Sequence, residues 1–196
     1  MIVVMQATLL VLAGGESRRM GRPKAWLDVG GTTLLRWMIE RFAPGFSDVV
    51  VSFAEPEQVH ELIPYRLVFD RKPSAGPLAG LEAGLSTARN EVTFAVACDM
   101  PYVTPEVAAM AVAASAGCDA AIPRIDGRPE PACAAYRRSA LPKITVALDA
   151  GRLRASDLAE ELDVAWLEGL EPDLFRSLNA PEDYERFRRE LGDGDN

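Results

Sequence analysis

The residues best suited to chemistry lie in one loop, from Leu12 to Lys24, directly after the apolar run Ala7–Leu12. The loop combines three glycines with four cations: Gly14, Gly15, Gly21, Arg18, Arg19, Arg22 and Lys24. Glycine lets backbone N–H groups come close to a ligand, and backbone donors with fixed cations suit a polyphosphate. The loop is neither a Walker A motif nor Gly-x-Gly-x-x-Gly, since it lacks Gly-Lys-Ser/Thr and its first two glycines are adjacent. The alternative is a solvated loop with incidental arginines.

Two aspartates follow other apolar runs. Asp99 ends Val92–Cys98, so its carboxylate emerges at the rim of a core, where a hard oxygen ligand suits Mg²⁺. The alternative for Asp99 is a cap on the turn at Met100-Pro101. Asp70 follows a third run and could accept hydrogen bonds from a ribose or a base; otherwise it is a turn residue or a partner of Arg71.

Small residues mark a further position, Gly76-Pro77, where a helix is expected to start. With Gly80 and Gly84 they allow a close approach, either by a nucleotide or by a strand of the sheet. His60 is the only histidine and is expected on an exposed helix, which excludes most zinc sites and Ser-His-Asp hydrolysis. The chemistry that remains uses positioning, cations and a carboxylate-bound metal, as in phosphoryl or nucleotidyl transfer.

The elements that must position these residues alternate between strands and helices, which indicates an α/β domain. Strands are expected at Ala7–Leu12, Asp48–Phe53, Arg66–Phe69, Val92–Cys98, Asp119–Ile125 and Pro131–Arg137. Helices are expected from Thr32 or Thr33 to Ala43, from Pro77, from Pro105 to Gly117, and over Leu141–Ala150, Ser156–Leu162 and Pro181–Leu191. Turn chemistry separates the last two strands at Asp126-Gly127-Arg128-Pro129. Ligands of open parallel sheets bind beyond the carboxyl ends of strands, where the loop and both aspartates fall.

The totals set the remaining limits. A chain of 196 residues with 48% hydrophobic residues predicts one domain, residues 1–191, with a frayed tail at 192–196. The net charge of −8 argues against a general nucleic-acid binder, and no apolar stretch has membrane-spanning length. Cys98, Cys118 and Cys133 are odd in number and far apart, which disfavours a disulfide scaffold or a zinc ribbon and fits a reducing cytoplasm.

Taken together, the motifs resemble one family. Leu12-Ala-Gly-Gly-x-Ser-x-Arg-Met-Gly-x-x-Lys24, Asp70, Gly76-Pro-Leu-Ala-Gly-Leu81, Cys98-Asp-Met-Pro101 and Asn179-Ala-Pro-Glu-Asp183 occur in the order found in molybdenum cofactor guanylyltransferases, the MobA family. The resemblance runs over almost the whole chain. It implies a Rossmann-like nucleotidyltransferase fold with a mostly parallel sheet, an antiparallel insertion and helices on both faces. It also implies transfer of GMP from GTP to molybdopterin, with Mg²⁺ and release of pyrophosphate.

Carried over by motif, the resemblance also implies roles for individual residues. Leu12, Ala13 and Gly14 would border the guanosine, and Gly15, Arg18 or Arg19, and Lys24 would hold the triphosphate, with catalytic roles for Lys24, Arg19 and Asp99. Asp70, Gly76 and Gly80 would contact the nucleotide, Asp99 would bind Mg²⁺, and Asn179 would lie near the pterin substrate. Molybdoenzyme chaperones or an accessory GTPase would be protein partners, whereas nucleic acid and membrane would not.

Three positions depart from the family pattern. Pro23 stands where the family usually has Asp, Ser177 replaces an Asn, and an Asn after the second strand has no counterpart in Ser52-Phe53-Ala54-Glu55. Related transferases that use CTP often have Pro before the lysine. A cytidylyltransferase, a sugar-phosphate nucleotidyltransferase and a non-catalytic nucleotide-binding module are therefore the alternatives.

Overall fold

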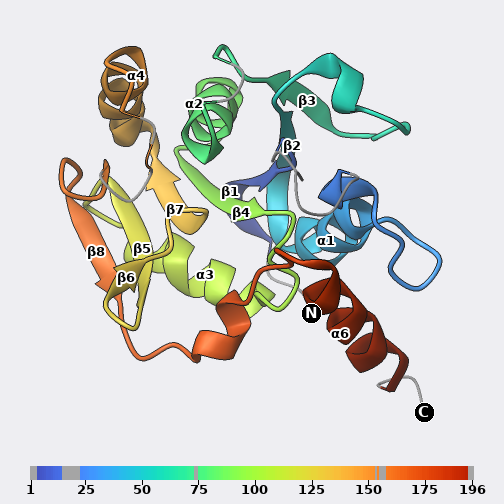
Figure 1. Ribbon diagram of the computed structural model, residues 1–196. Coiled ribbons are helices and arrows are strands. Elements are labelled where there is room, and N and C mark those ends of the chain that lie inside the picture. The colour runs from blue at the N-terminus through green and yellow to red at the C-terminus, as the bar shows by residue number, and fades with distance from the viewer. Residues whose placement is uncertain (1–3, 15–22, 73–74, 153, 155–157, 194–196) are drawn as a thin grey trace.

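The computed structural model describes residues 4–14, 23–72, 75–152, 154 and 158–193. Its centre is an eight-stranded sheet with the order β3-β2-β1-β4-β7-β5-β6, with β8 paired to β5 (Figure 1). The strands are β1 (Met5–Leu12), β2 (Phe46–Phe53), β3 (Arg66–Phe69), β4 (Val92–Ala97), β5 (Ala120–Ile125), β6 (Arg128–Pro129), β7 (Cys133–Arg137) and β8 (Val164–Leu167).

The first half of the sheet is parallel, and β7 introduces the antiparallel part. β1 pairs in parallel with β2 and β4, and β2 pairs in parallel with β3. β7 lies antiparallel between β4 and β5, while β8 returns parallel to β5. The expected mostly parallel sheet with an antiparallel insertion is confirmed.

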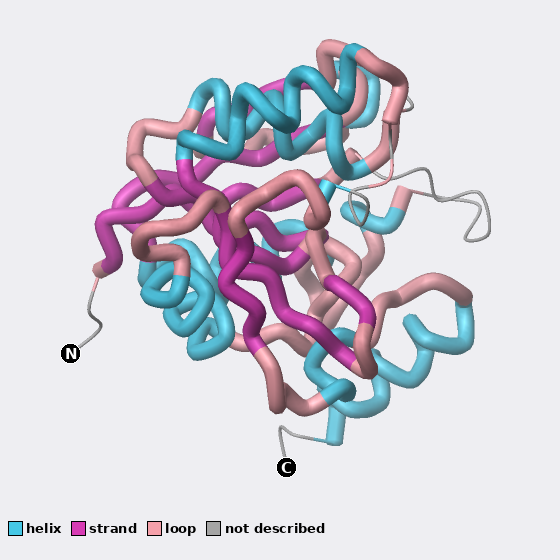
Figure 2. Tube along the Cα trace, turned by 90° about the vertical axis from the view of Figure 1, so that its left-hand side faces the viewer, coloured by secondary structure: helices cyan, strands magenta, loops and turns pink. Residues whose placement is uncertain are grey.

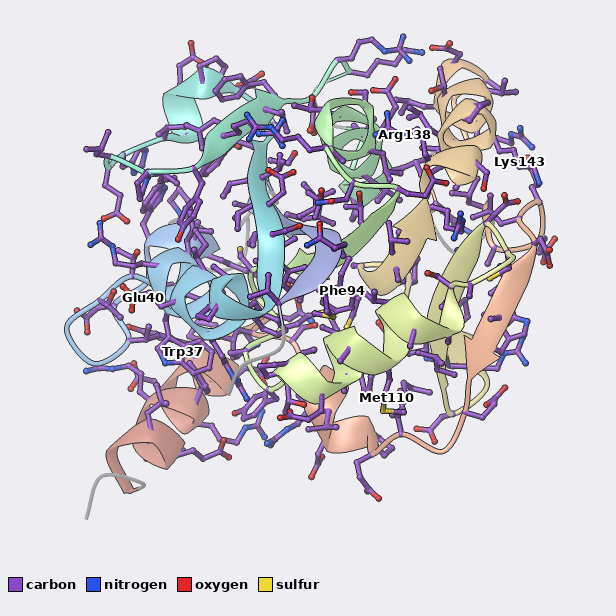
Figure 3. The ribbon with its side chains drawn as sticks, turned by 180° about the vertical axis from the view of Figure 1, so that it is seen from behind. Trp37, Glu40, Phe94, Met110, Arg138 and Lys143 are labelled. Atoms are coloured by element: carbon purple, nitrogen blue, oxygen red, sulfur yellow. The ribbon has the colours of Figure 1, made fainter. Side chains whose placement is uncertain are left out.

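Helices cover both faces of the sheet, so the strands carry apolar side chains on each side (Figure 2). The helices are α1 (Leu34–Phe42), α2 (Pro77–Thr87), α3 (Pro105–Ala114), α4 (Leu141–Asp149) and α6 (Pro181–Asp193). α1 and α3 pack on the face that carries Leu9 and Val11, and α2 and α4 pack on the face that carries Leu10. On the first face Phe94 of β4, which is labelled in Figure 3, stacks against Phe42 and Phe46.

Local chemistry explains where these elements begin and end. Thr33 caps α1, because its hydroxyl accepts a hydrogen bond from the Arg36 amide at 3.3 Å. Pro77 and Pro105 occupy the first turns of α2 and α3, where a missing N–H costs nothing. Asp126 and Gly127 both have positive φ, as the two-residue turn between β5 and β6 requires.

Several expectations need correction. α3 ends at Ala114 instead of Gly117, since Ser115 turns back to bond the Val112 carbonyl. The expected helix around His60 is only a 3₁₀ turn, Pro56–Gln58, because the backbone is extended at Val59. The His60 ring lies beyond this turn and stacks on Trp26. The strand β8 was missed, because its four residues are only partly buried and show no alternation.

Two expectations concern segments that lie partly outside the described residues. The expected helix Ser156–Leu162 lies partly outside them, and its described part, 158–162, consists mainly of turns. The expected frayed tail at 192–196 is wrong at its start, since α6 continues through Asp193, and 194–196 lie outside the described residues. Within those residues, no helix has both the length and the apolar character needed to cross a membrane.

Candidate functional site

A cleft of about 390 Å³ lies at the carboxyl ends of four adjacent parallel strands. The strand register brings these ends together, because Leu12 of β1 lies opposite Ser52 of β2 and Ala97 of β4. The loops that leave the strands therefore enclose one space. The cleft is lined by Leu12, Ala13, Gly14, Lys24, Ser52, Ala54, Glu55, Gln58, Asp70, Gly76, Pro77, Gly80, Ala97, Cys98 and Asp99.

Lys24, Asp99 and Asn179 meet at the β1–β4 end of this cleft, although they are far apart in sequence. Lys24 Nζ donates to Asp99 Oδ2 at 2.7 Å and to Asn179 Oδ1 at 3.0 Å. The Lys24 and Asp99 side chains are only 15% and 23% exposed. The cation and the carboxylate therefore face the same space, as expected from their positions after neighbouring strands.

The C-terminal segment holds this arrangement in place. The Leu178 amide donates to the Asp99 carbonyl at 2.8 Å, and the Tyr184 hydroxyl donates to the Asp28 carbonyl at 2.6 Å. The segment before α6 thus contacts the loop with Asp99, and α6 itself contacts the segment that follows Lys24. A separate apolar cluster supports these bonds, formed by Leu27, Val29, Leu34, Leu178, Tyr184 and Phe187.

Glycines allow the close packing beneath the cleft. A Cβ at Gly14 would lie 2.4 Å from the Ala54 backbone nitrogen, so only glycine lets the first loop pass the end of β2. Gly80 borders the cleft, with Ser52 Oγ 2.8 Å from where its Cβ would be, whereas Gly84 faces the Leu10 side chain. Helix–sheet packing therefore explains Gly84, and Gly80 serves the cleft and the packing together.

Asp70 lies at the β3 end of the cleft and accepts a hydrogen bond from Ser52 Oγ at 3.3 Å. Burial raises the pKa of the Asp70 carboxyl to about 6, and nearby Glu82 adds to the rise while the Ser52 bond opposes it. Arg71 instead pairs with Glu82 at 3.2 Å and with Asp149 at 3.0 Å. Arg71 thus joins the loop after β3 to α2 and α4, and the alternative pairing of Asp70 with Arg71 is wrong.

Comparison with known proteins decides the family. A family model described as a MobA-like NTP transferase domain matches residues 9–164. The chain belongs to this family. A probable molybdenum cofactor guanylyltransferase of Methanosarcina mazei is 35% identical over 91% of this chain and 88% of its own. Another so named, from Pelotomaculum thermopropionicum, is 36% identical over 79% and 75%.

Solved structures agree with the MobA-like assignment. Molybdopterin-guanine dinucleotide biosynthesis protein A from Archaeoglobus fulgidus has a TM-score of 0.81 and 28% identity, covering 95% of this chain and 99% of that one. The 2-C-methyl-D-erythritol 4-phosphate cytidylyltransferase of Thermus thermophilus has a TM-score of 0.74 at 20% identity, over 96% of this chain and all of its own. The second likeness concerns the fold alone, and it confirms the Rossmann-like nucleotidyltransferase architecture.

Eight of the residues expected from the sequence line the MobA-like cleft. Leu12, Ala13, Gly14, Lys24, Asp70, Gly76, Gly80 and Asp99 line it. Asn179 reaches it through Lys24. Gly15, Arg18 and Arg19 lie outside the described residues, so their roles stay predictions.

No site role was predicted from the sequence for the wall formed by the end of β2 and the following turn, where Ser52–Glu55 was named only as a departure from the family pattern. Ser52, Ala54, Glu55 and Gln58 line the cleft there. The signal was available, since Phe53 ends a strand that neighbours the one before the glycine loop. The segment carries no motif of its own.

The donor set suits a metal that a nucleotide brings with it. Among the described residues, no group of three or more His, Cys, Asp or Glu side chains could hold a metal ion. Asp99 offers carboxylate oxygen at the cleft, and Mg²⁺ commonly takes one or two carboxylates and completes its shell with phosphate oxygens and water. The site therefore fits magnesium bound jointly with a triphosphate.

Proposed function

We propose that the protein transfers GMP from GTP to molybdopterin, forming a guanine dinucleotide cofactor and pyrophosphate. The observation that carries the proposal is the contact of Lys24 with Asp99 in the cleft. The chain around this cleft matches the MobA-like family over most of its length. The relatives named for guanylyl transfer support the choice of GTP and of the pterin acceptor. Mg²⁺ bound at Asp99 would neutralise charge on the phosphate oxygens.

The reaction needs little acid–base chemistry from the protein. A terminal phosphate oxygen of molybdopterin attacks the α-phosphorus of GTP, and a new P–O bond forms. The bond from the α-phosphorus to the oxygen that bridges to the β-phosphorus breaks, and pyrophosphate leaves with that oxygen. Since the attacking phosphate is already anionic near neutral pH, no general base is required. Lys24 stabilises negative charge at the reacting phosphorus, and Asn179 orients the Lys24 ammonium.

The direct test combines the purified protein with Mg²⁺, molybdenum-loaded molybdopterin and one nucleotide at a time. We expect pyrophosphate and a dinucleotide product with GTP. Product from CTP alone would replace the proposal with cytidylyl transfer, and product with a sugar phosphate but not with molybdopterin would change the acceptor. Absence of product with every nucleotide and acceptor would contradict nucleotidyl transfer.

The variant Asp99→Asn separates catalysis from binding. It keeps the size of the side chain but removes its charge, so we expect turnover to fall about 100-fold or more. GTP affinity should fall much less, because the other cleft contacts remain. Asp173→Asn is the matched control, since Asp173 is 87% exposed in the turn before the C-terminal segment. Unchanged turnover in Asp99→Asn would remove Asp99 from its role.

The proposal also covers the compartment in which the protein acts and the proteins that receive its product. The three cysteines are free thiols, in agreement with a reducing cytoplasm. Delivery of the product through a molybdoenzyme chaperone or an accessory GTPase follows the family resemblance and is tested by co-purification with tagged protein.

A further inference from the structure

The cleft wall after β2 carries two polar side chains that the transfer step does not use, Glu55 and Gln58. Gln58 closes a 3₁₀ turn over Pro56–Gln58, and Glu55 is the residue just before it. The Glu55 side chain is exposed at the cleft and is not buried among apolar groups. Its carboxylate can therefore meet a ligand without being pulled from a core.

The Gln58 carboxamide has a defined orientation. Its Oε1 accepts a hydrogen bond from the Ala54 amide at 2.9 Å, and a backbone N–H can only bond the oxygen of the carboxamide. The Gln58 NH₂ group therefore remains as the donor end. The turn itself is held by Trp26, whose Nε1 donates to the Gln58 carbonyl at 2.8 Å and whose ring stacks with Phe53 and His60.

The two ends of the cleft differ in character. Lys24 and Asp99 lie at the β1–β4 end, while Glu55 and Gln58 follow β2. β2 is next to β1 and two strands from β4, and neighbouring strands are about 4.8 Å apart, so the ends of β2 and β4 are about 10 Å apart. The cleft continues from Lys24 and Asp99 toward the ends of β2 and β3, which gives room there for the nucleoside of a nucleotide whose phosphates lie at that pair. Its base then comes within reach of the wall after β2.

The chemistry of that wall matches one base. Guanine presents an acceptor, O6, beside two adjacent donors, N1–H and the N2 amino group. Adenine, cytosine and uracil have no such pair of adjacent donors on this edge. A carboxylate offers two acceptor oxygens to the donor pair, and the carboxamide NH₂ offers a donor to O6.

We infer that Glu55 and Gln58 select guanine. The Glu55 carboxylate accepts hydrogen bonds from guanine N1–H and N2–H, and the Gln58 amide donates to O6. The inference rests on the proposed function, because it takes the triphosphate to lie at Lys24 and Asp99. It assigns the choice of nucleotide to the segment after β2, separately from the residues that carry the transfer.

The test compares GTP with ITP, which lacks only the N2 amino group. Dissociation constants are measured by calorimetry with Mg²⁺ at pH 8, for the wild type, Glu55→Gln and Glu57→Gln. We expect the wild type to bind GTP at least about tenfold more tightly than ITP, since a hydrogen bond to a charged acceptor is lost. Glu55→Gln should weaken the binding of GTP about tenfold and the binding of ITP much less, so that the ratio of the two dissociation constants approaches one.

Glu57→Gln is the matched control, because Glu57 is exposed in the same turn and does not line the cleft. It should keep the wild-type ratio. Equal affinities for GTP and ITP in the wild type, or an unchanged ratio in Glu55→Gln, would overturn the inference. If GTP is still turned over with molybdopterin in that case, the proposed function stands without it. Failure of GTP to bind at all would overturn both.

Discussion

Asp70 shows how a carboxylate at the cleft can reduce stability. Its carboxyl is partly buried at the cleft, and burial together with Glu82 raises its pKa from 3.8 to about 6. Only Ser52 among the described contacts opposes this shift, because the nearby Arg71 is directed to Glu82 and Asp149. An acceptor held without a compensating cation is suited to hydroxyl or amino donors of a ligand. The folded chain therefore accepts a cost at this residue that an amide would avoid.

The sign of the effect follows from the two protonation states. Below the unfolded pKa of 3.8 the carboxyl is neutral in both the folded and the unfolded chain, so burial costs little. Above about pH 6 it is ionised in both, and the folded chain carries the full cost of burying the charge. Stability from this group is thus present at low pH and lost as the pH rises through 6.

Asp70→Asn should therefore stabilise the protein at neutral pH. We expect the free energy of unfolding to rise at pH 7.5 by on the order of 1 kcal/mol, a value reduced for partial exposure of the group. The gain should shrink steadily as the pH falls to 4.5. Urea unfolding at several pH values measures it, with Asp173→Asn as the exposed control. A gain that is constant with pH would show that ionisation of Asp70 is not its cause.

At the scale of elements, the contact of α2 with β1 sets the position of one wall of the cleft. Gly84 faces Leu10 so closely that an added Cβ would lie 2.3 Å and 2.4 Å from its two Cδ atoms. Both Leu10 and the surrounding residues of α2 are buried, so the leucine has little room to move. The small residue at Gly84 lets α2 lie against the sheet and places Gly80 and Gly76 at the cleft.

Gly84→Ala should destabilise the fold even though alanine favours helices. Overpacking of a core of this kind costs about 1–3 kcal/mol, which exceeds the gain of about 1 kcal/mol from helix propensity. Gly192→Ala is the matched control, because Gly192 lies in α6 with nothing within 4 Å of its Cβ position. Thermal unfolding should show a lower midpoint for Gly84→Ala and an equal or higher one for Gly192→Ala. A midpoint raised by both substitutions would contradict the packing argument.

α6 has a second role at this scale, since it joins parts of the site that are distant in sequence. Phe187 packs edge-on against Trp37 of α1 and Tyr102 of the loop after β4. Tyr184 bonds the Asp28 carbonyl close to Lys24. The helix thereby connects the loop after β4, which carries Asp99, to the segment that follows Lys24. Asn179, just before the helix, reaches the cleft through its hydrogen bond with Lys24.

At the scale of the whole molecule, periodicity and turn chemistry predicted most of the fold. β1, β2 and β4 each contain a buried, largely apolar run, as central parallel strands do, and Pro77 and Pro105 mark helix starts correctly. β8 was not predicted, because it forms through a long-range pairing with β5 and its own sequence shows no strand pattern. The turn at Pro56–Gln58 was not predicted, because it is held by a long-range hydrogen bond from Trp26 to the Gln58 carbonyl.

The residues of the candidate site also fall into those that the sequence predicted and those that it did not. Lys24, Asp70 and Asp99 were found because each follows a recognisable strand or motif, and parallel topology brings such ends together. Glu55 and Gln58 have no motif of their own. Their place in the cleft depends on the register of β2 with β1 and on the missing side chain at Gly14. These are properties of packing that the order of residues alone does not reveal.

Ligand binding should stabilise the whole molecule, because the cleft joins loops from four strands and, through Lys24, the C-terminal segment. A ligand at one hundred times its dissociation constant adds about 2.7 kcal/mol. For a chain of this length that corresponds to a rise in Tm of roughly 5–10 °C.

We expect this rise with GTP and Mg²⁺ at pH 7.5, and a smaller one at equal concentrations of CTP, ATP or UTP. Differential scanning fluorimetry measures the shifts, with EDTA as the control that removes the metal. A GTP shift that is unaffected by EDTA would contradict joint binding of the metal and the triphosphate at Asp99. Equal shifts with all four nucleotides would mean that the cleft binds the phosphates and does not read the base.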